Sequence, residues 1–150
     1  MCLSIFKHIL SGRQDMINQI SVFLENKAGQ LSSITKALSA KDINIRAINI
    51  AESTEYGVVR LIVDNHQKAI DALIEAGCVV SVTKVAAVVV PDVPGGLNLV
   101  LNTISDAKID IEYMYSMLEK NGGAAYMIFK VEDVDLFNST IEKSGLNVLK

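Results

Sequence analysis

The chain has 150 residues, of which 50% are hydrophobic, 5% aromatic and 21% charged. This length suits one ordinary domain or two small ones, and the composition indicates a folded protein with an aliphatic core, which excludes intrinsic disorder. The net charge of -3, the lack of a basic face and the lack of an apolar run of about 20 residues argue against nucleic acid or a membrane as a partner.

Residues 1–15 do not share the pattern that follows, and we treat them as an N-terminal extension. They lack the basic start, the long apolar middle and the cleavage site of a secretory signal. Leu3, Phe6 and Leu10 fall on one face of a helix, so a short docking helix is one interpretation. The other interpretation is that Met16 is the natural start of the chain.

The rest of the chain is an internal duplication, which becomes visible when Gly29 is placed over Gly95. Two extra residues in a longer hairpin of the second half then place Gly77 over Gly145. The two halves predict two domains, 16–84 and 85–150. Further matching pairs are Leu31 with Leu97, Ile43 with Ile109, Ile45 with Ile111, Gly57 with Gly123, Ile62 with Ile128 and Val63 with Val131.

Each half predicts the same elements in the order βαββαβ. A first strand runs into a glycine-bearing loop and a helix, and a second strand and a hairpin lead to a third strand. A second helix, capped by Asn65 or Asp133 and stopped by Gly77 or Gly145, precedes a last strand. The strands are predicted over 20–24, from Ile43, over 58–63 and over 78–82 in the first half, and over 85–90, from Ile109, over 125–131 and over 146–149 in the second.

This order predicts an α+β protein of two ferredoxin-like domains. Each domain has an antiparallel four-stranded sheet, with strands one and three in the centre and both helices on one face. We expect the two sheets to pair edge to edge through their second strands. The runs 58–63 and 85–90 are apolar without alternation, so both faces of each sheet need cover. We expect a second copy of the chain to cover the second face, in a homodimer.

Two loops, NKAGQL over 26–31 and DVPGGL over 92–97, are the first candidate sites. Glycine permits a sharp turn from strand to helix, and the unpaired N–H groups at the start of a helix favour an anion. A carboxylate is therefore the expected ligand of these groups. The alternative is a tight strand-to-helix turn that binds no ligand.

The repeated loop and the βαββαβ order resemble the ACT domain, a small regulatory module that senses amino acids in metabolic enzymes. The signature of that family is an Asp- or Asn-x-Pro-Gly-x-Leu loop, followed by a second strand that opens with a short apolar motif containing Asn or Asp. The loop 92–97 matches fully, 26–31 matches with Ala28 in place of proline, and DINI (42–45) and KIDI (108–111) supply the second motif. The resemblance covers nearly the whole chain and implies a stand-alone, non-catalytic amino-acid sensor without a metal or cofactor.

In family members that bind an amino acid, the ligand lies between two domains, held by the loop of one and the start of the second strand of the other. The resemblance implies that backbone N–H groups near Gly29, Gln30, Gly95 and Gly96 hold the ligand carboxylate. One pocket would join Asn26, Gly29 and Leu31 to Asp110 and Ile111, the other would join Asp92, Gly95, Gly96 and Leu97 to Asn44 and Ile45, and Ala28, Gln30, Val93 and Pro94 would complete the loops.

The polar residues of these pockets would bind the ligand ammonium group. Asn44 or Asp110 would accept a hydrogen bond from it, and Asn26 and Asp92 would meet the ammonium group or a polar ligand side chain. For these four residues, the capping of a turn or helix is an equal alternative.

Intrinsic enzyme activity is not expected. Cys2, Cys78, His8 and His66 form no metal-binding or redox motif, and no catalytic motif is present. The cysteines therefore indicate reduced thiols in the cytoplasm. RNA-binding domains share the βαββαβ order, but they need basic surroundings and stacking aromatic residues, which the run 58–63 lacks.

The main alternative is a regulatory subunit that acts by contact with a biosynthetic enzyme. Tyr113, Tyr115 and Met117 would then present a surface to that partner. The competing interpretation of this stripe is one buried face of a strand, because its members alternate with period two.

Overall fold

The computed structural model describes residues 16–25, 27–52, 56–118 and 125–149. The expected docking helix in 1–15, the loop residue Asn26 and the hairpin glycine Gly123 lie outside these residues.

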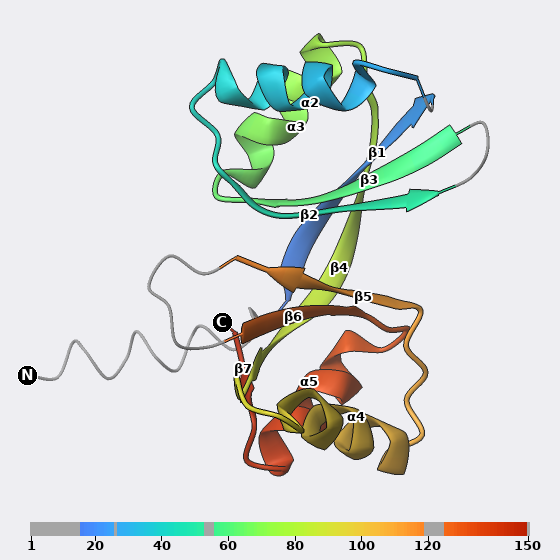
Figure 1. Ribbon diagram of the computed structural model, residues 1–150, viewed down its shortest axis with the longest axis vertical. Helices are drawn as coiled ribbons and strands as arrows, with labels where there is room; N and C mark the ends of the chain where they lie inside the picture. The colour runs from blue at the N-terminus through green and yellow to red at the C-terminus, as the bar shows by residue number, and fades with distance from the viewer. Residues whose placement is uncertain (1–15, 26, 53–55, 119–124, 150) are drawn as a thin grey trace, which may run out of the picture.

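The described chain forms two units with the same order of elements (Figure 1). The first unit contains β1 (Ile17–Glu25), α2 (Gln30–Ser39), β2 (Ile45–Glu52), β3 (Tyr56–Val63), α3 (His66–Glu75) and the first part of β4 (Val79–Val90). The second unit contains the rest of β4, α4 (Gly96–Asp106), β5 (Tyr113–Met117), β6 (Ala125–Lys130), α5 (Val134–Lys143) and β7 (Asn147–Val148). The order βαββαβ therefore occurs twice, as the sequence predicts.

Strand β4 belongs to both units, so the chain passes from one unit to the other inside a strand. Its first part pairs with β1, with Val85 opposite Ile17, and its second part pairs with β6, with Ala86 opposite Phe129. The predicted strands 78–82 and 85–90 are thus one continuous strand, and the boundary between 84 and 85 lies inside it. Residues 79–90 contain no glycine or proline, so nothing in the local sequence ends the strand.

Both sheets have the predicted strand order. In the first unit β2 pairs with β3, β3 with β1 and β1 with β4, which leaves β1 and β3 in the centre. In the second unit β5 pairs with β6, β6 with β4 and β4 with β7, which leaves β4 and β6 in the centre. All these pairs are antiparallel. The two strands that a crossover helix connects run parallel to each other, and they are never neighbours in the sheet.

The molecule has four layers, with helices outside and the two sheets inside (Figure 1). Helices α2 and α3 cover one sheet and enclose a core that includes Ile20 and Val22 of β1. Helices α4 and α5 cover the other and enclose a core around Phe129 and Phe137, whose ring centroids are 5.3 Å apart. Each strand alternates, so one set of its side chains faces the helices and the other set faces the opposite sheet.

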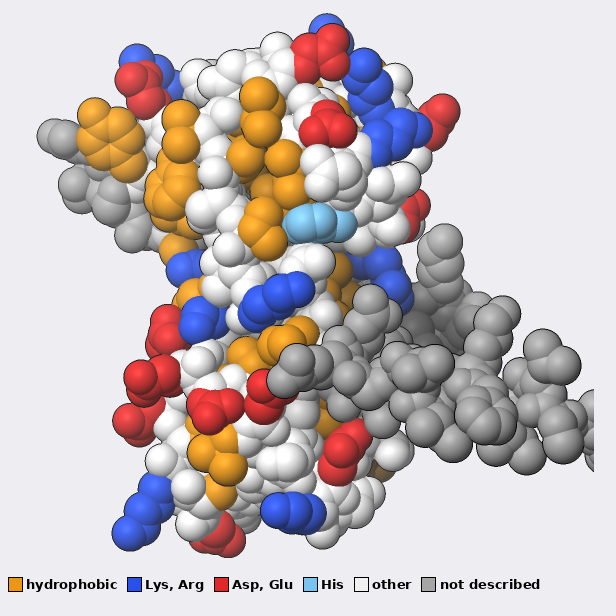
Figure 2. All heavy atoms as spheres, turned by 180° about the vertical axis from the view of Figure 1, so that it is seen from behind, with side chains coloured by type: hydrophobic (Ala, Val, Ile, Leu, Met, Phe, Trp, Pro, Cys, Tyr) orange, Lys and Arg blue, Asp and Glu red, His pale blue; other side chains and the backbone are white. Residues whose placement is uncertain are grey.

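The second face of each sheet is covered in part within the chain, which corrects the expectation that a second copy covers it. A third core lies between the two sheets and is formed by Ala47, Ile62, Val85, Ala87, Tyr115, Met117 and Ile128. Farther along the first sheet this cover ends, and Phe23 and Val79, which lie opposite each other, are 50% and 66% exposed. Figure 2 shows hydrophobic side chains gathered on the outside of this unit.

The second strands do not pair edge to edge within the chain. β2 and β5 stand at opposite ends of the strand order, and each pairs along its length only with the third strand of its own unit among the described strands. They meet near one end, where the N–H of Leu118 donates to the carbonyl oxygen of Arg46 at 2.9 Å. The continuous β4 decides this arrangement, because it connects the units and lets their sheets stack face to face.

The second strands begin later than predicted, at Ile45 and Tyr113 instead of Ile43 and Ile109. The N–H of Ile43 donates back to Leu38 O at 3.1 Å, and the N–H of Ile109 donates to Ile104 O at 3.2 Å. Both isoleucines therefore belong to the hydrogen-bonded end of the preceding helix, a common way to satisfy the last carbonyl groups.

Candidate functional site

The loop after β4 turns the chain sharply into α4, and its two glycines have different structural reasons. Gly95 occupies the N-cap position with φ of 89°, a left-handed conformation that favours glycine. Gly96 is buried, and a Cβ there would overlap the carbonyl oxygen of Pro91. The pair is therefore required by the turn itself, whether or not a ligand binds.

The loop after β1 repeats this geometry with less constraint. Gly29 is the N-cap of α2 with φ of 89°, the same value as Gly95. Gln30 stands where the other loop has Gly96, and it is exposed. Lys27 forms an ion pair with Glu25, and its carbonyl oxygen accepts from the N–H of Gln30 at 3.3 Å. Asn26 lies outside the described residues, so its predicted role has no geometry here.

Two of the N–H groups expected to be unpaired, those of Gln30 and Gly96, are hydrogen-bonded within the turns. The N–H of Gly96 donates to Val93 O at 2.9 Å, as that of Gln30 does to Lys27 O, so both are used by the turns. The first bond within α4 runs from the N–H of Leu99 to Gly95 O at 3.1 Å. The N–H groups of Leu97 and Asn98 precede it and have no acceptor within the helix.

The starts of α2 and α4 differ from those of α3 and α5 in how they are capped. Asn65 accepts from the N–H of Lys68 at 3.1 Å, and Asp133 accepts from that of Leu136 at 2.9 Å, as the sequence predicts. Gly29 and Gly95 supply no side-chain cap, and neither α2 nor α4 has an acidic residue in its first turn. These two helix starts are therefore open to a negatively charged group from outside.

Asp110, at the approach to β5, lies on an acidic hollow. The hollow has a volume of about 150 Å³ and is lined by Lys108, Ile109, Asp110, Glu132, Asp133 and Leu136. Both Asp110 and Glu132 are exposed, whereas the carboxylate of Asp133 caps α5. Exposed carboxylates are suited to a cationic group, which here would share the hollow with Lys108.

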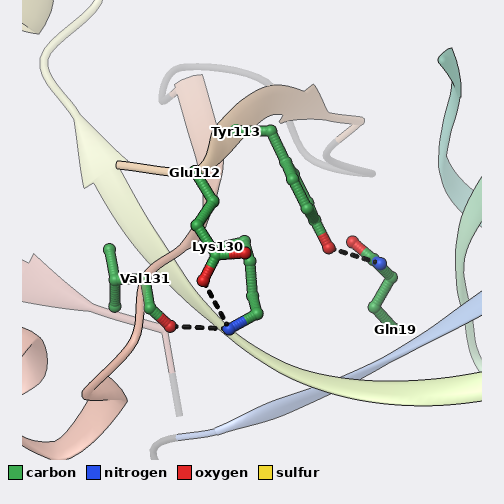
Figure 3. Close-up of polar contacts among 5 residues, drawn as sticks. All are labelled: Gln19, Glu112, Tyr113, Lys130 and Val131. Atoms are coloured by element: carbon green, nitrogen blue, oxygen red, sulfur yellow. Dashed lines mark hydrogen bonds and ion pairs between the residues drawn. The ribbon is translucent and has the colours of Figure 1, made fainter. Parts of the chain in front are cut away.

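The segment that follows Asp110 is held by its own unit (Figure 3). The ammonium group of Lys130 contacts Glu112 Oε1 at 3.1 Å and donates to Val131 O at 2.8 Å. The N–H of Glu112 donates to Lys130 O at 2.9 Å. Ile111, between Asp110 and Glu112, is partly buried against the core of the second unit.

Asn44 occupies the corresponding place in the first unit and is engaged through its backbone. Its N–H donates to Asp64 Oδ1 at 3.1 Å, and its carbonyl oxygen accepts from the N–H of Asp64 at 3.2 Å. Ile45 follows and pairs with Val63 at the start of β2. The side chain of Asn44 is exposed.

One chain brings neither predicted pocket together. The loop after β4 lies beside α4 in the lower unit, whereas β2 begins in the upper unit (Figure 1). The loop after β1 lies at the far end of the upper unit, whereas β5 begins in the lower unit. The two parts of each pocket are apart because β2 and β5 lie in different sheets. Pairing of these two strands would bring the parts together. Asp92, Val93 and Pro94 are exposed in their loop, as is Ala28 in the other.

Sequence reasoning missed a polar cluster between the two units. Gln19 of β1 is fully buried, and its side-chain oxygen accepts from the hydroxyl group of Tyr115 at 2.8 Å. Its side-chain nitrogen donates to the hydroxyl oxygen of Tyr113 at 2.8 Å, which Figure 3 shows, and to Ser21 Oγ at 3.1 Å. The guanidinium group of Arg60 lies 3.8 Å from the centre of the Tyr113 ring. The sequence feature that could have revealed this cluster is the pair of polar residues Gln19 and Ser21 at alternate positions of β1. From sequence alone, such polar residues are expected to face solvent.

The stripe Tyr113, Tyr115 and Met117 is the buried face of a strand and not a free surface. Tyr115 and Met117 are 7% and 5% exposed. Burial raises the pKa of Tyr115 well above its ordinary value, with a smaller contribution from Tyr113, so its hydroxyl group is a hydrogen-bond donor throughout the physiological range. Of the two interpretations, the structure confirms the buried face.

The described residues contain no group of three or more His, Cys, Asp or Glu side chains that could hold a metal ion. Burial raises the pKa of the Cys78 thiol, which makes it less reactive. No helix in the described part of the chain is both long and apolar enough to span a membrane.

Comparisons with known proteins agree with this architecture. A family model described as an ACT domain pair matches residues 15–149. A solved structure of a protein from Bacteroides thetaiotaomicron is 33% identical, with a TM-score of 0.84 over 90% of this chain and 92% of that one. The regulatory subunit of aspartate kinase from Thermus thermophilus, at 16% identity and a TM-score of 0.62 over 88% of this chain and 95% of that one, shares the fold. A comparison with curated protein sequences finds no match.

Proposed function

The chain belongs to the family of ACT domain pairs, and on this basis we propose that it is a non-catalytic regulatory protein that binds a free amino acid. The observation that carries the proposal is the difference in capping between its helices. The helices that follow Gly29 and Gly95 lack a side-chain cap, whereas those that follow Asn65 and Asp133 have one. The uncapped pair starts at the loops that resemble the ligand-binding loops of the family.

The carboxylate of the amino acid would bind at these helix starts. At α4 it would accept hydrogen bonds from the N–H groups of Leu97 and Asn98, which have no acceptor within the helix. The positive end of the helix dipole adds to this attraction. The exposed Asp92 stands next to the turn and would meet the ammonium group or a polar side chain of the ligand.

The ammonium group would bind at the start of a second strand. Asp110 and Glu132 provide two exposed carboxylates in the hollow before β5. In the first unit the equivalent position holds the neutral Asn44, so the two kinds of pocket differ in charge. We propose that the pocket containing Asp110 favours the more cationic ligand.

A second copy of the chain would complete both pockets. β2 and β5 each have one edge without a ladder partner among the described strands. A two-fold related copy that lays its β5 antiparallel along β2 brings the start of that β5 to the end of the sheet where the Gly29 loop lies. The edge strand β2 also exposes Ile48 and Ile50, at 43% and 47%, which such a contact would cover.

The second candidate function is a regulatory subunit that acts by contact with a biosynthetic enzyme. One observation favours it, namely the exposed apolar pair that Phe23 and Val79 form on the face of the first sheet opposite its helices, beyond the cover of the second sheet. Aspartate kinase regulatory subunits from Thermus thermophilus and Thermus flavus have the same fold. The two functions are compatible, and ligand binding by the isolated chain distinguishes a sensor from a subunit that acts by contact alone.

The test is thermal unfolding of the purified chain with each of the proteinogenic amino acids in turn. A ligand held at about 100 times its dissociation constant adds about 2.7 kcal/mol of stability. For a chain of this length this raises the unfolding midpoint by roughly 5–10 °C. A shift for one or two amino acids identifies the ligand, and no shift with any of them contradicts the sensor function.

A pair of double variants tests the site itself. Gly29→Asp with Gly95→Asp puts a negative charge at both uncapped helix starts, and we expect it to abolish the shift. Gly77→Asp with Gly145→Asp is the matched control, because those glycines have similar φ values of 80° and 83° but lie at helix ends away from the proposed pockets. Unchanged affinity in the Gly29→Asp, Gly95→Asp variant would mean that the loops are not the site. Loss of binding in both double variants would assign the loss to a strained fold and not to the loops.

A further inference from the structure

Gln19 connects the first unit to the end of β5 at which the proposed ammonium site begins. It lies on β1, the strand that ends in the Gly29 loop, and it donates to Tyr113, the first residue of β5. Tyr113 directly follows the segment from Asp110 to Glu112, which carries the proposed ammonium site. The hydrogen bond at 2.8 Å therefore joins β1 to the very end of β5 where that site begins.

The bond is well placed to fix a position, because it is partly shielded from water. Gln19 is fully buried, and its amide group uses both its oxygen and its nitrogen on tyrosine hydroxyl groups of the other unit. Because the oxygen of the amide group accepts and its nitrogen donates, the orientation of this planar group is set. Its orientation in turn sets the positions of both tyrosine hydroxyl groups. The Arg60 guanidinium group covers the Tyr113 ring at 3.8 Å and holds it from the side of the first unit.

The segment before β5 is also held from the second unit. Lys130, whose side chain is 19% exposed, pairs with Glu112 at 3.1 Å, and its backbone oxygen accepts from the Glu112 N–H. Residues 110–112 form no strand of their own, so these contacts and the Tyr113 hydroxyl bond are what determine their path (Figure 3). The Lys130 contacts set this path within the second unit, and the Gln19 contact sets it relative to the first.

We infer that Gln19 is a positioning residue, which fixes residues 110–112 relative to the first unit through Tyr113 and thereby sets the affinity of the acidic pocket for its amino acid. The inference rests on the proposed function. Gln19 touches no ligand in this proposal. It acts by limiting the paths that the Asp110 carboxylate can take, so that less ordering is required when the ligand binds.

The experiment compares Gln19→Leu, Tyr113→Phe and Tyr115→Phe with the wild-type chain and with Gln67→Leu. Gln67 is the matched control, because its side chain donates to Asp71 at 3.0 Å on the exposed surface of α3. Affinity for the amino acid found in the thermal screen is measured by calorimetry well below the unfolding temperature. We expect affinity to fall about tenfold or more in Gln19→Leu and Tyr113→Phe, equivalent to about 1.4 kcal/mol, and to remain unchanged in Gln67→Leu.

Tyr115→Phe separates positioning from stability alone. Tyr115 bonds the same Gln19 side chain, but it lies farther along β5 from Asp110. We expect it to reduce stability as much as Tyr113→Phe does, with a smaller loss of affinity. Equal losses of affinity at equal losses of stability would overturn the inference, because the cluster would then act only by holding the fold together.

Hydrogen exchange gives a readout that needs no ligand. In wild type the Glu112 N–H is bonded to Lys130 O, so it should exchange slowly. We expect this amide and its neighbours in 109–113 to exchange faster in Gln19→Leu and Tyr113→Phe, but not in Gln67→Leu. Unchanged exchange there would overturn the inference even if an amino acid binds. If wild type binds none, the proposed function fails separately, and the exchange result still decides whether Gln19 positions this segment.

Discussion

Asp42 and Lys108, at matching positions of the two repeats, have the same left-handed backbone conformation, with φ of 54° and 55°. They are the only described residues other than glycine with positive φ. Each follows a helix, and each precedes an isoleucine whose N–H bonds back to that helix. An acid and a base thus occupy one conformation, which shows that the repeat preserves the backbone path even where the side chains have diverged.

Gly95→Ala should weaken ligand binding more than its cost in stability explains. No atom lies within 4 Å of a Cβ placed there, so the cost comes from the left-handed backbone and amounts to about 1–2 kcal/mol. Gly77→Ala has the same open surroundings and a φ of 80°, so it should cost a similar amount without affecting binding. Urea unfolding and calorimetry of both variants check this, and equal affinities would argue against a ligand at the Gly95 turn.

Gly96→Ala should be more destabilising than its counterpart in the first unit. Its Cβ would overlap the backbone oxygen of Pro91, so the turn must shift, at a cost of about 1–3 kcal/mol. Gln30 holds the equivalent place, is exposed, and should tolerate alanine within about 0.5 kcal/mol. The measurement is the free energy of unfolding in urea. Similar values for the two variants would mean that the loops do not differ in the way described.

Gln19→Leu should cost about 1–3 kcal/mol of stability, because it leaves the buried hydroxyl group of Tyr115 and the partly buried one of Tyr113 without their partner. Adding Tyr113→Phe and Tyr115→Phe should recover a large part of this loss, since the groups that were left unpaired are then absent. Unfolding of the single, double and triple variants forms a cycle that checks the coupling. Additive losses would show that these side chains do not act as one cluster.

Acidification should destabilise the chain through His66. Its Nε2 is buried without a hydrogen-bond partner, and burial lowers the pKa of the imidazole, helped by the nearby Lys84. The unfolded chain therefore binds a proton at a higher pH than the folded chain does. The contribution of His66 to stability is fully present above the ordinary histidine pKa, and it is lost as the pH falls through the lowered pKa of the folded chain.

The measurement is unfolding of wild type and His66→Gln at about pH 7.5 and about pH 5.5. We expect the wild type to lose more stability than the variant on acidification. An equal loss in both proteins would assign the pH dependence to other groups.

The chain should form a dimer that depends on the edge of β2. Ile48→Glu with Ile50→Glu puts two charges on that edge strand, and we expect a monomer with weakened amino-acid binding. Leu99→Glu is the control for the mass alone, because Leu99 is 52% exposed on α4, away from this edge. Its amino-acid binding is not compared, because it adds a negative charge in the first turn of α4. Light scattering after gel filtration gives the masses. A wild-type monomer would contradict the proposal that a second copy completes the pockets.

Much of the local structure could be predicted because it depends on neighbouring residues. Asn65 and Asp133 cap their helices as expected, and Gly77 and Gly145 end them with positive φ. The turns at Gly29 and Gly95 are also correct, since a left-handed position selects glycine by its own sterics. The two loops and the two strand starts of the candidate site could likewise be located one at a time, and their binding of a ligand stays a prediction.

The assembly of these pieces could not be predicted in this way. Val85, read as the start of a new strand, lies inside β4, because no local signal states whether a run of apolar residues pairs with one sheet or with two in succession. Gln19 lies before the predicted strand 20–24, and only the packing of the second sheet against the first makes it buried and bonded to Tyr113.

The sequence by itself determined the duplicated βαββαβ units, their turns and their helix ends, because each is a balance of forces within a few residues of chain. The tertiary structure alone decided that the units share a strand, that their sheets stack, and that the halves of each predicted pocket lie apart. These features depend on the burial of whole sheet faces against residues far away in the chain. The free energy of this burial cannot be deduced from any short stretch of sequence.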